Sequence, residues 1–263
     1  MNNKLKYRWK VLMQYSNLIG ELIKRDIKLK YRRSFFGYVW SVLNPLLIMV
    51  VLTVVFSAMF KRNIENYPIY LITGRVLMEF MKSSTLMGLK SVTGNAALLK
   101  KTYIPKYVFT LAKTTSSFVD TVFSFGAFVI VMIATRSPFF WQLIFVPFVL
   151  IQVYLFSLGL SFLLAQMNVF FRDIEYIYHA ICVAWTYLTP IFYPIERLPN
   201  LLQVVIRIFN PMYCYITQFR YCALYGRVPP VGMVVAGWFW AALMMAFGLY
   251  EFRKNQDRFI LFL

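Results

Sequence analysis

One stretch of the sequence constrains the fold more than any other: residues 24–33 carry six Lys or Arg side chains, and residues 34–60 carry no charge at all. An apolar run of this length exceeds the ~20 residues that a helix needs to cross a ~30 Å hydrocarbon layer. Basic side chains gain roughly 1 kcal/mol each beside anionic lipid, and Tyr38 and Trp40 follow at the depth that amphipathic rings favour. We therefore expect the chain to enter a membrane here, with residues 1–39 as a cytoplasmic arm.

The composition places the whole chain in the same class. Of the 263 residues, 60% are hydrophobic and 14% are charged, and the mean hydropathy is +0.62, whereas soluble proteins carry about 25% charged residues. We predict an all-α integral membrane protein, built as one domain over residues 1–263. The net charge of +18 accompanies no nucleic-acid-binding motif, so we assign it to membrane topology and to membrane lipids as partners, with no nucleic acid.

Apolar runs separated by short polar segments predict six transmembrane helices. The predicted spans are residues 40–60, 67–88, 107–135, 139–165, 177–194 and 231–250. They make a bundle over residues 40–250, and residues 251–263 form a cytoplasmic tail. Both termini are then cytoplasmic, and most of the 28 Lys and Arg residues lie on that side, as the positive-inside rule requires.

Three shorter segments are expected outside the spans. Apolar residues at helical spacing over residues 15–27 predict an amphipathic helix lying in the membrane interface. Residues 198–209 and 212–225 are apolar but too short to cross the bilayer, and Asn210 and Pro211 separate them. We expect both to be re-entrant helices on the outer side or to lie on the outer surface.

Among the charged residues within the predicted spans, Arg75, Glu79 and Asp120 are the candidate intramembrane charges. A single charge at the bilayer centre costs about 2.5–3.5 kcal/mol on insertion scales, so such residues face protein or water. Arg75 and Glu79 are four residues apart on one helical face and can pair. Either a buried stabilising pair or a conduit lining fits this pattern. Asp120 is a functional candidate or a structural residue, and the sequence identifies no partner for it.

The sequence lacks the motifs of a self-sufficient enzyme. None of its eleven glycines precedes a lysine, so no phosphate-binding loop is present. We expect this chain to be a transport subunit that binds no cofactor or metal itself. Its cysteines, Cys182, Cys214 and Cys222, are expected to be packing residues, with a Cys214 to Cys222 bridge as the alternative.

Four ordered motifs carry a family resemblance. They are residues 25–45, which include Gly37, Trp40 and Pro45; residues 95–106, NAALLKKTYIPK; residues 168–174, NVFFRDI; and residues 189–194, TPIFYP, with Asn210 and Pro211 beyond. Together they span essentially the whole chain. In these motifs the chain resembles the membrane subunits of polysaccharide-exporting ABC transporters, the ABC-2 type permeases for O-antigen, capsule and wall teichoic acid.

The resemblance implies an ABC-2 exporter fold and a homodimer in the bacterial cytoplasmic (inner) membrane. Each subunit would be seated on a separate ABC ATP-binding subunit, which carries ATP and Mg, and the complex would export a lipid-linked glycan. Residues 74–79 depart from the apolar, tryptophan-containing segment expected there.

The resemblance also places the contacts with the ATPase. The amphipathic helix, the loop over residues 95–106 and the turn at Arg172 would form them. Rigid helices need charges that fix their register on a partner. The candidate coupling residues are Arg25, Asp26, Lys28, Lys100, Lys101, Arg172, Asp173 and Glu175.

A channel between the two subunits would be lined by the first and fifth spans. A glycan conduit needs flat apolar faces together with hydrogen-bonding groups, and Tyr and Trp supply both. The candidate lining residues are Tyr38, Trp40, Tyr178, Trp185, Tyr187 and Tyr193. A membrane-interface belt or ordinary core packing remains open for each of them.

Two other transport functions stay in view. One is an ABC-2 permease for a drug or a small lipid. The other is a stand-alone secondary carrier, which normally uses inverted repeats, and we find no such repeat.

Overall fold

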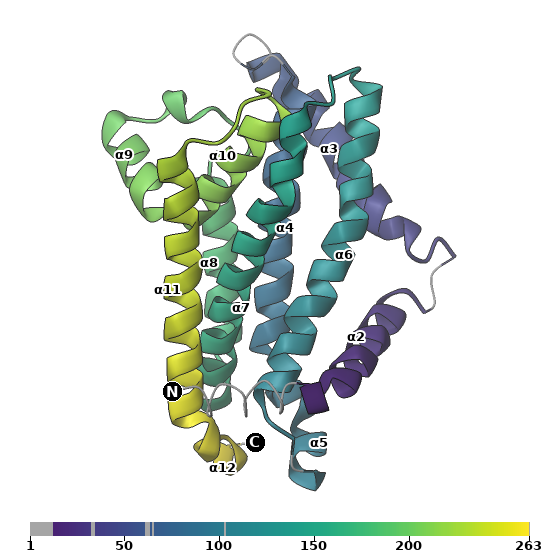
Figure 1. Ribbon diagram of the computed structural model, residues 1–263, viewed down its shortest axis with the longest axis vertical. Coiled ribbons are helices and arrows are strands. Elements are labelled where there is room, and N and C mark those ends of the chain that lie inside the picture. Colours follow the sequence, from purple (N-terminus) through teal and green to yellow (C-terminus); the bar gives the residue numbers. More distant parts are fainter. Residues whose placement is uncertain (1–12, 33–34, 61–63, 65, 103, 263) are drawn as a thin grey trace.

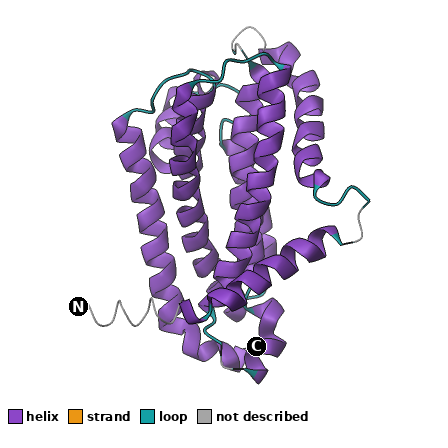
Figure 2. Cartoon of the chain, turned by 45° about the vertical axis from the view of Figure 1, so that its right-hand side comes forward, coloured by secondary structure: helices purple, strands orange, loops and turns teal. Residues whose placement is uncertain are grey.

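The computed structural model describes residues 13–32, 35–60, 64, 66–102 and 104–262, and within these it is helical with no strand (Figures 1 and 2). The α-helices are α2 Ser16–Tyr31, α3 Val39–Phe60, α4 Tyr67–Leu89, α5 Ala96–Lys101, α6 Tyr107–Ala134, α7 Val146–Phe170, α8 Ile174–Leu188, α9 Asn200–Phe209, α10 Pro211–Ala223, α11 Val231–Asn255 and α12 Phe259–Phe262. Short 3-10 helices are η1 Thr93–Asn95, η2 Trp141–Phe145, η3 Ile195–Arg197 and η4 Gln256–Arg258.

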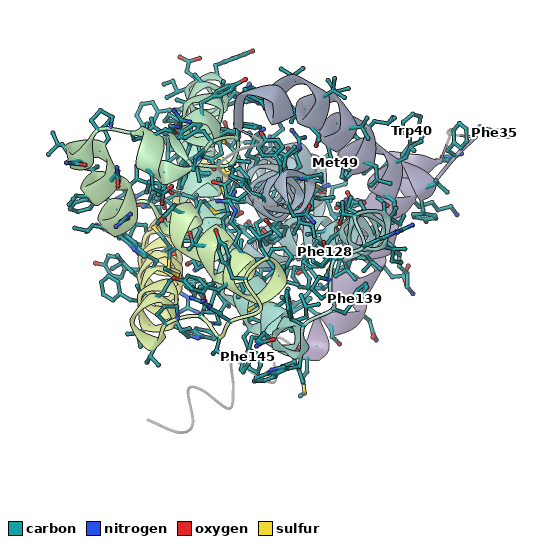
Figure 3. The ribbon with its side chains drawn as sticks, turned by 90° about the horizontal axis from the view of Figure 1, so that it is seen from above. Phe35, Trp40, Met49, Phe128, Phe139 and Phe145 are labelled. Carbon is teal, nitrogen blue, oxygen red and sulfur yellow. The ribbon has the colours of Figure 1, made fainter. Side chains whose placement is uncertain are left out.

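Helix α4 is the centre of the bundle. It packs against α3, α6, α7, α8 and α10, and most of its side chains are buried. Its neighbours α3 and α8 each leave most of their surface exposed. Seen along the bundle in Figure 3, Met49 of α3 lies inward, whereas Trp40 lies at the periphery. The core is therefore built around α4, and α3 and α8 contribute few buried side chains to it.

Four helices are long and apolar enough to cross a membrane: Val39–Phe56, Tyr107–Ala134, Trp141–Phe170 and Val231–Phe262. They correspond to the first, third, fourth and sixth predicted spans. Helix α4 has 23 residues but carries the charges of Arg75, Glu79 and Lys82, so it does not meet the same criterion of composition.

The predicted fifth span, residues 177–194, is wrong in its bounds. Helix α8 ends at Leu188 and has 15 residues, about 22 Å at 1.5 Å per residue. Pro190 explains the early end, because a proline disfavours the helical conformation of the residue before it. Thr189 accordingly has an extended backbone, with φ −82° and ψ 131°.

The two short apolar segments form helices α9 and α10, close to the predicted bounds. Helix α9 buries only Ile206, whereas α10 is mostly buried and packs on α4, α7 and α11. Asn210 separates them, because its side-chain oxygen accepts from the backbone N–H groups of Met212 at 3.1 Å and Tyr213 at 3.3 Å. This cap and a proline at the first helical position fix the start of α10.

The cysteines are free and buried. The packing interpretation is confirmed, and the alternative of a bridge between Cys214 and Cys222 is wrong. Cys214 donates instead to the carbonyl oxygen of Met233 at 3.2 Å.

Candidate functional site

Three segments that are distant in sequence meet at one end of the bundle, which we call the inner end. They are α2, the connection from α4 to α6 that contains α5, and the turn between α7 and α8, and the C-terminal α12 lies at the same end (Figure 1). The amphipathic pattern explains the position of α2, since Leu22 is buried in a cluster with Val108, Phe109 and Ala112. Helix α2 thus packs across the lower part of α6 instead of standing free.

An ion pair fixes α2 on α6. A carboxylate oxygen of Asp26 lies 2.8 Å from the ammonium nitrogen of Lys113, and the Asp26 side chain is only 5% exposed. Arg25 lies 3.4 Å from the same carboxylate oxygen and donates to the side-chain oxygen of Asn95 at 3.5 Å. These contacts connect α2 to the α4–α6 connection as well as to α6.

A second ion pair fixes the α7–α8 turn. Lys90, just beyond α4, lies 2.6 Å from a carboxylate oxygen of Glu175 at the start of α8. Asn168 donates to the carbonyl oxygen of Leu89 at 3.2 Å and to the hydroxyl of Thr93 at 3.3 Å. The ends of α4 and α7 are therefore held together at the inner end.

Two adjoining hollows lie on this surface, and we call them together the inner groove. One of about 410 Å³ is bordered by Arg25, Asp26, Leu29, Met87, Lys90, Gly94, Asn95 and Lys113. The other, of about 350 Å³, is bordered by Lys90, Thr93, Gly94, Asn168, Arg172 and Glu175. Lys90 and Gly94 border both, so the groove runs from α2 to the α7–α8 turn.

The structure brings half of the predicted coupling residues together. Those that border the inner groove are Arg25, Asp26, Arg172 and Glu175. Those outside it are Lys28, Lys100, Lys101 and Asp173, all of which are exposed. Asp26 and Glu175 have basic partners within the chain, so they position helices, whereas Lys28, Lys100 and Lys101 form no ion pair among the described residues.

The C-terminal segment also docks at the inner end. The Lys106 ammonium donates to the backbone carbonyl oxygen of Gln256 and lies 5.7 Å from the ring centroid of Phe259. Burial lowers the pKa of Lys106, and the negative charge of Asp257 opposes this shift by raising the pKa. This contact ties the start of α6 to the segment beyond α11.

The three predicted intramembrane charges border one cavity of about 340 Å³ between α2, α3, α4 and α6, which we call the polar cavity. Its lining consists of Lys30, Trp40, Ser41, Asn44, Pro45, Arg75, Val76, Glu79, Phe80, Ser83, Ser117, Asp120, Thr121 and Ser124. Lys30 forms an ion pair with Asp120. The expected Arg75 and Glu79 salt bridge is not formed among the described residues, since Glu79 pairs with Lys82 at 3.7 Å.

The predicted lining residues do not form one cluster. Tyr38 and Trp40 are exposed at the start of α3. At the far end of α8, Tyr187 is exposed, and Tyr193 donates to its carbonyl oxygen at 2.8 Å. In contrast, Trp185 is half-buried and donates to Asn210 at 3.0 Å.

Tyr178 differs from these residues because it is buried in the subunit. Its side chain is 5% exposed, and its hydroxyl lies 2.8 Å from that of Thr85 on α4, to which it donates. A tyrosine in this position anchors α8 on α4. It presents no surface to a substrate in this arrangement.

The partners Lys30, Lys90 and Lys113 were missed as site residues in the sequence. A signal for two of them exists, because Asp26 and Lys30 are four residues apart on α2, and Lys113 and Asp120 are seven apart on α6. Both spacings put the residues on one helical face. On α2 the acidic residue precedes the basic one, and on α6 the basic residue precedes the acidic one. This order allows the two pairs, Asp26 with Lys113 and Lys30 with Asp120, to form side by side.

Comparisons with known proteins identify the family of the chain. The family model for the ABC-2 type transporter matches residues 17–224. The O-antigen export system permease protein RfbA of Myxococcus xanthus is 27% identical over 248 residues, which are 93% of this chain and 95% of that protein.

Two further relatives extend the comparison. An RfbA protein of the same description from Klebsiella pneumoniae is 31% identical over 223 residues, 84% of each chain. The capsule polysaccharide export inner-membrane protein CtrC of Neisseria meningitidis is 22% identical over 201 residues, 73% of this chain and 74% of that protein. Since the family match covers most of the sequence and includes α2, the inner groove and α10, the chain belongs to the ABC-2 type transporter family of membrane proteins.

Proposed function

We propose that this chain is the permease subunit of an ABC transporter that exports a lipid-linked polysaccharide, of O-antigen, capsule or teichoic acid type, across the bacterial cytoplasmic membrane. It works as a homodimer, and two copies of a separate ATP-binding subunit hydrolyse ATP with Mg. Both termini are cytoplasmic. The names of the relatives support the substrate class, because they describe O-antigen and capsule polysaccharide export.

The observation that carries the proposal is the construction of the inner end. Two ion pairs, Asp26 with Lys113 and Lys90 with Glu175, join three segments into one polar surface. Exposed Lys100 and Lys101 on α5 extend it. A rigid surface of this kind transmits a movement of a soluble partner to α4, α6 and α8 together, and its charges set the register of the partner.

The outer faces of α3 and α8 complete the proposal. Helix α8 buries only Tyr178 and Cys182, although its sequence is apolar. A second copy facing α3 and α8 would enclose a conduit whose walls include Tyr38, Trp40 and Tyr187. In that dimer α4 and α8 supply the second and fifth spans, and α9 and α10 are the re-entrant helices of the outer side.

Export by membrane vesicles tests the proposal. Inverted vesicles that contain this chain and its ATPase should accumulate labelled lipid-linked glycan when ATP is added. Replacing Tyr38, Trp40 and Tyr187 together by alanine should lower uptake at least about tenfold while the ATPase remains bound. The matched control is Trp141→Ala, which removes a ring that is 68% exposed on another surface.

The outcomes separate this function from its alternatives. Uptake of a small lipid or a drug in place of glycan would show an ABC-2 permease of another substrate class. Uptake driven by an ion gradient without ATP would show a secondary carrier, and either result contradicts the proposal.

A further inference from the structure

A hollow lies at the end opposite the inner end, close to α9 and α10 (Figure 1). We call it the outer cavity. Its volume is about 960 Å³, within the roughly 300–1,000 Å³ of small-molecule sites. Parts of α4, α9, α10, α11 and the connection after α8 form its walls. None of the predicted coupling, lining or intramembrane residues borders it.

The outer cavity is basic. Its lining includes Arg207, Arg220 and Arg227 but only one carboxylate, Glu196. Arg220 is 4% exposed and has no salt bridge in the part of the chain that the structure describes. Buried charges in proteins are normally paired, and charges at membrane depth mark ligand or ion pathways. The cavity thus holds a positive charge that the chain itself does not neutralise with an anion.

The position of Arg220 is built by its surroundings. Its guanidinium donates to the carbonyl oxygens of Pro190 at 2.9 Å, Tyr70 at 3.1 Å and Ile191 at 3.3 Å. A side chain added at Gly74 would lie 3.1 Å from the same guanidinium. These carbonyl oxygens are uncharged, so they orient the guanidinium of Arg220 but do not neutralise its positive charge.

Two polar atoms beside this position lack a partner. The Nε of Arg220 and the hydroxyl of Thr217 are buried and form no hydrogen bond with any residue that the structure describes. Both residues border the outer cavity and lie three apart on α10, so they share a face. Unsatisfied polar groups of this kind cost about 1–3 kcal/mol each, and a polar ligand would remove that cost.

Aromatic rings border the same space. Tyr70, Tyr213, Tyr221 and Tyr225 line the outer cavity, and the guanidinium carbon of Arg220 lies 3.4 Å from the ring centroid of Tyr70. Tyrosine combines a flat apolar face with a hydroxyl, which suits a hydroxylated group attached to an anion. Nearby, Val228 and Val231 are exposed and offer an apolar surface for a lipid tail.

We propose that the outer cavity binds the phosphate ester of a lipid headgroup that carries a net negative charge, with Arg220 at the base of the cavity and Arg207 and Arg227 at its rim. Arginine recognises phosphate through charge-assisted, often bidentate hydrogen bonds. The phosphate belongs either to an anionic phospholipid or to the carrier lipid of the exported glycan. The second source rests on the proposed function, whereas the ligand chemistry does not.

Binding to the purified full-length chain tests the site. Native mass spectrometry with phosphatidylglycerol, a polyprenyl phosphate sugar and zwitterionic phosphatidylcholine compares the three headgroups. Both anionic lipids should bind at least about tenfold more tightly than phosphatidylcholine. Arg207→Gln with Arg227→Gln should weaken that binding about fivefold without unfolding the chain, because both side chains are exposed. Arg136→Gln, at another exposed arginine, is the matched control.

Each outcome bears on the site. Tighter binding of the polyprenyl phosphate sugar identifies the carrier lipid as the source, and tighter binding of phosphatidylglycerol identifies the phospholipid. Equal binding of phosphatidylcholine, or unchanged binding by the rim variant, overturns the proposal. Arginine-dependent binding in a chain that exports no glycan from vesicles would instead refute the proposed function alone.

Discussion

The ammonium of Lys113 on α6 lies 2.8 Å from a carboxylate oxygen of Asp26 on α2. The Asp26 side chain is 5% exposed and that of Lys113 is 23% exposed. A pair this sheltered is weakly screened by solvent and salt. It therefore holds α2 against α6 when force acts on the inner end.

Asp26→Asn should loosen α2. The substitution leaves the sheltered ammonium of Lys113 without its counter-charge, which costs about 1–3 kcal/mol. Thermal unfolding in detergent should show a lower midpoint, and limited proteolysis should cut α2 sooner. Glu21→Gln is the control, because its pair with Lys24 is 71% and 76% exposed and is worth little. Equal midpoints for the two variants would contradict this role of Asp26.

The pair of Lys90 and Glu175 should matter for coupling more than for stability. Its side chains are 54% and 30% exposed, so its loss costs only about 0–1 kcal/mol. Glu175→Lys places two cations at the inner groove and should separate ATP hydrolysis from export. The exchanged variant Lys90→Glu with Glu175→Lys should recover part of the coupling. Export per ATP hydrolysed measures both, and an exchanged variant no better than the single one would refute the idea.

Charge reversal on α5 tests the ATPase contact directly. Lys100→Glu with Lys101→Glu should detach the ATP-binding subunit in a pull-down, because both side chains are exposed at the inner end and face a partner by electrostatic complementarity. Arg136→Glu, at the opposite end, should leave the complex intact. Retention of coupled hydrolysis by the α5 variant would count against the proposed contact.

Much of the fold could be predicted because it follows from length and periodicity. The apolar stripe over residues 15–27 predicted α2. The two apolar segments of 12 and 14 residues, which are too short to cross a membrane, predicted α9 and α10. Four spans follow from long apolar runs. The fifth span was predicted to end too late, because the sequence stays apolar beyond Thr189 although Pro190 ends the helix.

The site was less predictable because it depends on contacts between distant helices. Asp120 had no identifiable partner in the sequence, and its partner Lys30 was expected to contact lipid headgroups. Arg220 was hidden in a short apolar segment that was considered only for its length. A lone arginine among apolar residues is itself a signal, and it is the one that would have located the outer cavity.

The ion pair of Lys30 and Asp120 yields a prediction about the polar cavity. Asp120→Asn leaves Lys30 without its counter-charge beside the polar cavity and should lower the amount of folded protein. Lys30→Met with Asp120→Leu removes both charges, and replacing both partners of an ion pair by apolar residues is often neutral or stabilising. Size-exclusion profiles should therefore show the double variant recovering toward wild type. A double variant worse than Asp120→Asn would show that the cavity needs the charges for another reason.

Helices α7 and α11 approach each other closely at Gly159 and Gly248. A side chain at Gly248 would overlap the carbonyl oxygen of Gly159, and one at Gly159 would overlap the backbone of Met244. Small residues let membrane helices approach this closely. Gly248→Ala should then cost more than the typical 1–3 kcal/mol of overpacking, because backbone atoms have to move. Gly232→Ala, in the same helix but with open space around it, should stabilise the chain by about 0.5–1 kcal/mol instead. A thermal midpoint of Gly248→Ala that is no lower than that of Gly232→Ala would show that the two helices do not meet at Gly159 and Gly248.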